Sequence, residues 1–461
     1  MGKTNRILVL AALLLAALIT RAQMVSPVDF MRLNPYQLNA NPAASLPYQS
    51  VLSVVVGNVG FDMQNSALRY DNLFEFDAEG RPASVSLTKL ANSLKDDNYS
   101  GFHAQWELFT FYRRLVKGAI SVNYGIKAQG DMRYNEGLFQ LVGYGNGAFV
   151  GEDHPACIDM DINAKAYHEL AVGYQYDLTE RLSLGGRAKL LFGLADVRTD
   201  VLNATLYTAP DTYAIRFQDE VAMRMALPKA LVGNALFGNP GLGLDLAAEY
   251  RINEQFSAVA AVRDLGFIHW GKNSTEVKGQ VNDAGQFYAD GDFLFEGLGI
   301  DELQLIISDD WYREQFLDTL QRYFKLQSDP MGGYTTALNT NLMLRGNFDL
   351  DVHNRFSAQV QGCFLNTGFR PAFTVAYCGS FWNNLNVCAS YTAMPESYDN
   401  IGLGISAMIE TCNIYLTTNN LLGILRPFNT SGFSAQAGVV FNLFVPGKHY
   451  VDESSKPTYL E

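Results

Sequence analysis

The 461-residue chain has few cysteines and no excess of positive charge, and beyond its first 22 residues it has no long apolar run. The five cysteines form no C-x-x-C pair and no histidine lies at metal-ligand spacing from them, so a zinc site is not expected. A net charge of −13 argues against nucleic acid as a partner, because phosphate binding needs a basic face. Without an apolar run of about 18 residues, no helix of the mature chain is expected to span a membrane.

Motifs that support catalysis or bind cofactors are also missing. The six histidines are scattered, and neither H-E-x-x-H nor G-x-S-x-G occurs. The run from Asp159 to Asn163 begins like a calcium-binding loop, but Ala164 replaces the turn glycine and Leu170 replaces the bidentate glutamate. The sequence therefore predicts no enzyme, no metal and no cofactor.

The N-terminus reads as a signal for export. Lys3 and Arg6 precede an apolar stretch from Ile7 to Ile19, and a small residue, Ala22, ends the segment. This is the pattern of a signal peptide, so residues 1–22 are set apart from the fold.

What the mature chain does contain is apolar residues spread at alternate positions. In AISVNYGIKAQ, Ile120, Val122 and Tyr124 share one face while Ser121 and Asn123 share the other, and 48% of the whole chain is hydrophobic. Period two over about ten residues predicts a strand of membrane-spanning length. Fourteen such strands are predicted, at residues 51–62, 102–113, 118–130, 166–178, 182–195, 241–251, 256–268, 334–350, 356–366, 371–381, 385–394, 400–409, 411–421 and 432–444.

The connections between these strands distinguish a membrane barrel from a soluble sandwich. Every second link is a tight turn, while four of the others are long, at residues 63–101, 131–165, 196–240 and 269–333. Tight turns on one side and long loops on the other are typical of an outer-membrane barrel with both termini on the tight-turn side. We therefore predict an all-β fold, a transmembrane antiparallel β-barrel of about fourteen strands over residues 51–444, followed by a polar periplasmic tail at residues 445–461.

Several of these stretches resemble a known family. They are Asn41-Pro42-Ala43-Ala44, the strand–turn pair YQYDLTERLSLGGRAKL, the run DLGFIHW from Asp264 to Trp270, and the closing strand GFSAQAGVVFNLF. Together they resemble a family of exported outer-membrane barrels similar to the long-chain fatty-acid transporter FadL and to the PorV and PorP barrels associated with type IX secretion.

The resemblance implies that residues 23–50 fold into the lumen as a hatch. Two Asn-Pro pairs suit a compact plug that must not pair as a strand, because proline lacks an N–H. A disordered periplasmic leader is the alternative. The residues assigned to the hatch are Asn34, Pro35, Asn41, Pro42, Ala43 and Ala44.

Charged residues fall at mid-strand on the face opposite the apolar one. They suggest either a wet pore lined with charge or a salt-bridged, plugged interior, and the barrel size favours plugging. Any one of these charged residues either binds a ligand or only neutralises its neighbours of opposite charge. The expected lumen-facing charges are Glu107, Lys127, Arg187, Lys189, Asp245, Glu249, Arg263 and Arg345.

One long loop contains an amphipathic pattern behind Asp309 and Asp310, which are possible helix caps. The helix is either a lid over the mouth, where a hydrophobic ligand first binds, or a helix packed on neighbouring loops. Its apolar residues are Trp311, Tyr312, Phe316, Leu320 and Phe324.

Cys378 and Cys388 lie symmetrically about a predicted tight turn and on the inward face. Opposed Cβ atoms on neighbouring strands lie about 4.5 to 5.5 Å apart, more than the about 3.8 Å of a disulfide. A disulfide is possible, and free thiols are the favoured expectation.

The sequence thus predicts a protein of the Gram-negative outer membrane, in contact with membrane lipid, that binds or transports small hydrophobic molecules. The mechanism implied by the resemblance is capture among loop residues, descent into the lumen, and exit by a hatch shift or lateral opening. The alternative is a PorV-like scaffold that holds surface or secretion protein partners. A barrel-embedded lipid hydrolase would need a serine and a histidine facing the bilayer at one level, and no strand offers that pair.

Overall fold

The structure is a computed structural model that describes most of the chain. The residues described are 25–31, 34–44, 50–67, 69–79, 82–115, 117–211, 213, 215–227, 238–271, 274–279, 311, 326–382, 384–395, 397–425, 430 and 432–444. The predicted signal peptide and polar tail lie outside these residues, as does the helix predicted in the long loop, except for Trp311.

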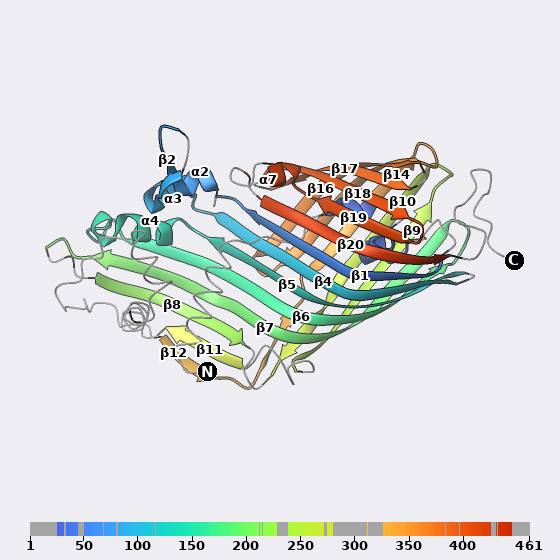
Figure 1. The fold of residues 1–461 in the computed structure, drawn as a ribbon. Helices are drawn as coiled ribbons and strands as arrows, with labels where there is room; N and C mark the ends of the chain where they lie inside the picture. The colour runs from blue at the N-terminus through green and yellow to red at the C-terminus, as the bar shows by residue number, and fades with distance from the viewer. Residues whose placement is uncertain are drawn as a thin grey trace.

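Fourteen antiparallel strands form a closed barrel (Figure 1). The first strand pairs with the last, with Gly60 opposite Gln436, so the ring has no open seam. The predicted all-β barrel of about fourteen strands is therefore confirmed. The strands are β1 (Ser50–Asn65), β4 (Asn98–Leu115), β5 (Gly118–Tyr134), β6 (Ala156–Asp177), β7 (Leu182–Thr208), β9 (Pro240–Arg251), β10 (Phe256–Trp270), β14 (Thr340–Asp349), β15 (Asn354–Leu365), β16 (Gly368–Phe381), β17 (Leu385–Met394), β18 (Ser397–Ile409), β19 (Cys412–Thr418) and β20 (Gly432–Phe444).

The two faces of the wall differ as the alternation predicts. Leu190, Leu246 and Leu344 point outward and are 49%, 49% and 64% exposed, whereas Arg187 and Lys189 point inward and are buried. An exposed apolar surface that encircles a barrel is what lipid tails cover, and charged residues on the inner face are shielded from lipid.

The loop end of the barrel carries strands that the sequence reading placed in loops. β8 (Ile215–Ala226), β11 (Ser274–Gly279) and β12 (Leu326–Pro330) extend the sheet from the second half of β7. The strand predicted at residues 334–350 is divided into β13 (Tyr334–Ala337), which pairs with the end of β10, and β14. The prediction of strandless loops at residues 196–240 and 269–333 was wrong in these parts. The extension projects beyond the ring of fourteen strands (Figure 1).

Short helices gather at the same end. Within the described residues, no helix has the length and apolar character needed to cross a membrane. Ser86 caps α3 by accepting a hydrogen bond of 3.2 Å from the Lys89 N–H. Leu141 of α4 packs in an apolar cluster with Met132 and Ile158, on the strand face opposite the lumen. The helical and minor elements are α2 (Tyr70–Leu73), β2 (Phe74–Phe76), β3 (Pro82–Val85), α3 (Leu87–Ser93), α4 (Gly137–Tyr144), η3 (Asn146–Ala148) and α7 (Leu421–Leu425).

The N-terminal segment lies inside the barrel, and we call residues 25–31 and 34–44 the hatch. It contains two turns of 3-10 helix, η1 (Pro27–Phe30) and η2 (Pro35–Asn39), each with proline at its start, where an N–H would be unpaired in any case. The Asn34 side chain caps η2 by accepting a bond of 3.0 Å from the Tyr36 N–H. Nearly every hatch side chain is buried.

Candidate functional site: a hatch in a charged lumen

The first turn of the hatch rests on an apolar seat. Val28, Phe30 and Met31 cluster with Tyr415 of β19 and with Cys388 of β17. Several other wall residues beneath this turn are small, among them Ala376 and Cys378. A side chain at Gly404 of β18 would meet Met31 and Pro27, so glycine at that position leaves room for the hatch.

Arg345 of β14 holds the same turn from the side. Its Nη1 donates to the Asp29 carbonyl at 2.8 Å, and its guanidinium lies 4.3 Å from the centre of the Phe30 ring. Its Nε donates to Gln359 at 2.7 Å, so the guanidinium plane is fixed. A buried arginine bound in this way recognises backbone and aromatic ring together.

The second turn and the loop after it are held by hydrogen bonds to lumen carboxylates. Asn39 Nδ2 donates to Glu107 at 2.6 Å, and Asn41 Nδ2 donates to Glu249 at 2.7 Å. Asn58 of β1 donates to the other oxygen of Glu107 at 3.0 Å. The two hatch asparagines therefore act as donors toward wall carboxylates, and we call these contacts the latch.

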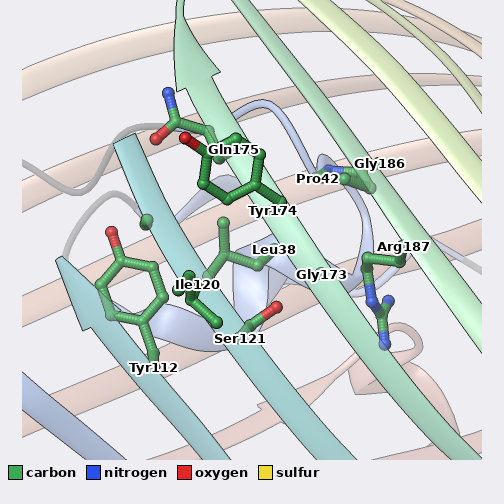
Figure 2. A pocket seen from close by; sticks show the side chains of 11 residues that line it. Leu38, Pro42, Tyr112, Ile120, Ser121, Gly173, Tyr174, Gln175, Gly186 and Arg187 are labelled. Carbon is green, nitrogen blue, oxygen red and sulfur yellow. The ribbon is translucent and has the colours of Figure 1, made fainter. Parts of the chain in front are cut away.

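The loop fits closely against the wall beside the latch. A side chain at Gly185 of β7 would overlap the Pro42 carbonyl, so the hatch backbone approaches here only because that residue is glycine. Figure 2 shows Leu38 and Pro42 of the hatch behind the strands that carry Gly173 and Arg187. The space between them is about 10 Å³, the size of one water molecule.

Above the latch, a network of ion pairs crosses five strands. Its members are Lys127, Glu169, Arg187, Lys189, Asp245 and Asp264.

Lys189 is the centre of this network. Its Nζ lies 2.6 Å from Asp264 Oδ1, 2.7 Å from Asp245 Oδ1 and 3.7 Å from Glu169 Oε2. Arg187 Nη1 lies 3.3 Å from Asp245 Oδ2, and Lys127 Nζ lies 2.8 Å from Glu169 Oε2. Three cations face three carboxylates, so this layer is electrically balanced and holds neighbouring strands together.

An apolar layer fills the lumen next toward the mouth. Tyr167, Leu191, Ile268 and Trp270 are almost fully buried there and cluster with Tyr334. The Trp270 indole N–H donates to Thr336 at 2.8 Å, which satisfies its polar atom.

At the mouth, opposite walls of the barrel meet. β4 and β15 stand seven places apart in a ring of fourteen strands, yet Tyr99 of β4 packs with Cys363 and Leu365 of β15. Arg133 of β5 donates to the Thr367 carbonyl in the β15–β16 turn at 3.2 Å. The lumen therefore narrows to a contact between walls at this level.

The structure places all eight lumen-facing charges predicted from sequence on the inner face. Six are buried, and Lys127 and Glu249 are half-buried. Glu107 and Glu249 contact the hatch directly, as do Arg345 and Arg263, whose Nη1 is 3.5 Å from the Asn39 carbonyl. The remaining charges belong to the ion-pair network.

The predicted hatch residues contribute unequally. Asn41 donates to the wall, and Asn34 caps η2. Pro42, Ala43 and Ala44 pack in the narrow space beside β7 and its neighbours.

The expectation of free thiols at Cys378 and Cys388 was wrong. The residues lie directly opposite each other on β16 and β17, and the structure joins them in a disulfide. The Cα atoms of the two cysteines are 4.1 Å apart, closer than the about 4.5 Å of an ideal opposed pair, which is why the expectation from ideal strand spacing failed. In the predicted mouth helix, Trp311 is helical and exposed, while Tyr312, Phe316, Leu320 and Phe324 lie outside the described residues.

Sequence reasoning missed two members of the ion-pair network. Glu169 sits at the inward parity of its predicted strand, so the alternation rule could have found it. Asp264 could not be found in this way, because a bulge on β10 turns both Arg263 and Asp264 inward and gives Asp264 a φ of 56°.

The fold and the site together define a class of protein: a closed transmembrane β-barrel whose lumen holds its own N-terminal segment beneath layers of wall side chains. Residues 42–419 match the model of DUF5723, described as a family of unknown function, and the chain belongs to this family. No curated protein matches the chain.

Solved barrels of the FadL type are similar to the chain. A FadL homologue of Pseudomonas aeruginosa has a TM-score of 0.45 and 9% identity, with 91% of this chain and 96% of that one covered. The Ralstonia pickettii toluene transporter TbuX has a TM-score of 0.44 and 11% identity, with coverage of 89% and 94%. The Pseudomonas putida toluene transporter TodX has a TM-score of 0.40 and 10% identity, with coverage of 89% and 94%.

Proposed function

We propose that the protein resides in the outer membrane and binds or transports small hydrophobic molecules. The apolar layer of the lumen carries this proposal. Tyr167, Leu191, Ile268 and Trp270 lie between the ion-pair network and the polar mouth, where a water-filled porin would have polar residues. A hydrophobic solute that reaches this layer would find contacts that an ion or sugar would not.

Entry would require the walls to part at the mouth. The contact there includes the packing of Tyr99 on β15, the guanidinium of Arg370 of β16 at 3.5 Å from the centre of the Tyr99 ring, and a hydrogen bond from the Arg133 side chain to the Thr367 carbonyl. Such a contact is small enough to open without unfolding the barrel, since a single hydrogen bond contributes only about 0.5 to 1.5 kcal/mol net.

Exit would follow either a hatch shift or a lateral path. The wall between β9 and β10 supports the lateral path, because Gly243 and Gly266 leave bare backbone between the lumen and an outer groove. Leu242, Leu265 and Phe267 line that groove on the lipid side. The bulge at Asp264 interrupts the pairing of the two strands at this point.

The proposal is tested by direct binding. The purified protein in nanodiscs of neutral lipid would be titrated with a panel of toluene, octane, octanol, octylamine and octanoate, with empty nanodiscs as the blank. We expect saturable binding of at least one compound.

A matched pair of variants makes the test specific. Ile268→Asn places an amide in the apolar layer and is expected to weaken binding about tenfold or more. Val352→Asn, at a turn position that is 58% exposed, is the control and leaves binding unchanged. Failure of the whole panel to bind would contradict the proposed function.

A scaffold for protein partners is the second candidate. The sheet formed by β7, β8, β11 and β12 projects beyond the ring (Figure 1) and offers a surface that the barrel itself does not need. Purification from native membranes distinguishes the two: a stoichiometric protein partner supports the scaffold, and saturable hydrophobe binding by the isolated barrel supports transport.

A further inference from the structure

A second polar layer lies between the apolar layer and the mouth, and it differs from the ion-pair network below. Asp131 of β5, Asn163 and Lys165 of β6 and Asp196 of β7 are at most 3% exposed. Thr367, from the opposite wall, is 7% exposed and its hydroxyl lies near the Asp131 carboxylate. The layer thus includes groups from both sides of the lumen.

The donors of this layer are engaged. Asn163 Nδ2 donates to Asp131 Oδ1 at 2.8 Å, which also fixes the orientation of the amide. Lys165 Nζ donates to the Ala337 carbonyl at 2.6 Å and lies directly opposite Asp196 in the strand register. The Tyr334 hydroxyl donates to Asp196 Oδ2 at 2.8 Å.

Several acceptor oxygens of this layer, by contrast, have no hydrogen-bond donor among the residues that the structure describes. In the described part of this layer, Asp131 Oδ2, Asn163 Oδ1 and Asp196 Oδ1 are buried acceptors that have no hydrogen-bond partner in the geometry. The Thr367 hydroxyl is also unpartnered there and is placed to donate to Asp131. A buried acceptor without a donor costs about 1 to 3 kcal/mol, and more if it is charged. Two donors, the Thr367 hydroxyl and Arg198 Nε, are also without a hydrogen-bond partner, so free acceptors outnumber free donors among the described residues of this layer.

The balance of charge in this layer also favours a ligand that donates hydrogen bonds. Two carboxylates, Asp131 and Asp196, attract a single buried ammonium, Lys165. The next cation, Arg198, lies directly opposite Asn163 in the strand register, but its side chain is 30% exposed and its Nε is 3.9 Å from Asp200 Oδ1. The next carboxylate, Asp161 of the neighbouring strand β6, accepts a hydrogen bond of 3.1 Å from the Thr199 hydroxyl.

Apolar contacts for the rest of a ligand are adjacent. Tyr334 belongs to the apolar layer through its ring and to the polar layer through its hydroxyl. Lys165 binds the carbonyl next to Leu338, which is a member of the same apolar cluster. A molecule with a polar head at Asp131 and Asp196 would place its apolar body against Trp270 and its neighbours.

We propose that this layer is a binding site for the head group of an amphiphile that donates hydrogen bonds, such as an alkylammonium or an alcohol, in preference to a carboxylate. The inference rests on the proposed function. A donating head supplies what the free oxygens lack, whereas a carboxylate would add a further acceptor and a like charge.

The test uses three ligands with one chain length. Octylamine, octanol and octanoate are titrated into the full-length protein in neutral nanodiscs at neutral pH, with toluene as a ligand that has no head group. We expect octylamine and octanol to bind at least about tenfold more tightly than octanoate. Asp131→Asn and Asp196→Asn keep the shape but remove charge, and each is expected to lower the preference for octylamine over octanoate about tenfold.

Asp153→Asn, an exposed loop carboxylate, is the control and leaves that preference unchanged. Octanoate binding as tightly as octylamine, or an unaltered preference in both variants, would overturn the head-group site while leaving the proposed function in place. Binding of toluene alone would overturn it in the same way. If none of these four ligands binds and octane does not bind either, the proposed function itself fails.

Discussion

The two ends of the hatch differ in the main interaction that holds each of them in the lumen. The first turn, with Val28, Phe30 and Met31, is embedded by apolar packing against β16 to β19. The later loop, with Asn39 and Asn41, is held by hydrogen bonds to carboxylates on β4 and β9.

This difference indicates which end moves. Apolar burial is lost in full when a segment leaves its seat, at about 25 cal/mol per Å². A hydrogen bond to a carboxylate can be exchanged for one to water, so its net contribution is small. We therefore expect the latch to release while the first turn stays in its seat.

The largest loss of stability is expected when the ion-pair network next to the latch is disrupted. Lys189→Met removes the cation shared by Asp245 and Asp264 and leaves buried carboxylates uncompensated, which costs about 3 to 5 kcal/mol. The free energy of unfolding in detergent measures this loss. Lys95→Met, at an exposed loop position, serves as the control, and an equal effect in both variants would refute the role of the network.

The latch is tested by replacing the amide group of Asn39 with a carboxylate. Asn39→Asp places a carboxylate 2.6 Å from Glu107 and replaces a hydrogen bond with repulsion, and we expect a loss of about 2 to 3 kcal/mol. Hydrogen exchange of residues 35–44 should rise at least about tenfold. Adding Glu107→Gln restores a donor–acceptor pair and should recover most of the protection. No recovery in the double variant would show that the two residues are not coupled.

The fit of the loop against β7 is tested by adjacent glycines. Gly185→Val must displace the Pro42 backbone, at a cost of about 1 to 3 kcal/mol, and should raise exchange in the latch loop. Gly186→Val points to the other side of the wall, where the nearest atom to a new Cβ is 3.5 Å away. Equal exchange in the two variants would contradict the close approach of hatch and wall.

The apolar end of the hatch is tested through the disulfide beneath it. Replacing both Cys378 and Cys388 with alanine removes a crosslink beneath the first turn and should lower the free energy of unfolding by about 2 kcal/mol. Exchange should rise at residues 26–31 and stay constant at residues 39–44. Mass spectrometry of unreduced peptides checks the disulfide itself, and two free thiols in wild-type protein would count against it.

How far the sequence could predict this architecture depends on the range of the interactions involved. Alternation predicted all fourteen wall strands and the inward placement of residues such as Lys189, because both follow from local period two. It could not predict that Arg133 reaches Thr367, since that contact joins opposite walls. Nor could it predict the inward turn of Asp264, because one bulge shifts the parity of every residue after it.

The short strands at the loop end of the barrel could not be predicted from the alternation of apolar residues either. β11 and β12 contain six and five residues and pair only after β7 and β8 have placed them. The latch was partly visible, because two Asn-Pro pairs predicted an ordered plug, but the partners of Asn39 and Asn41 lie on strands remote in sequence.

The central claim is that the lumen is closed by its own residues and opens for a hydrophobic solute rather than for water. Ion conductance of the wild-type protein in a planar bilayer tests it most directly. The closed lumen predicts no steady conductance after insertion. A stable, porin-sized conductance from unmodified protein would contradict the account.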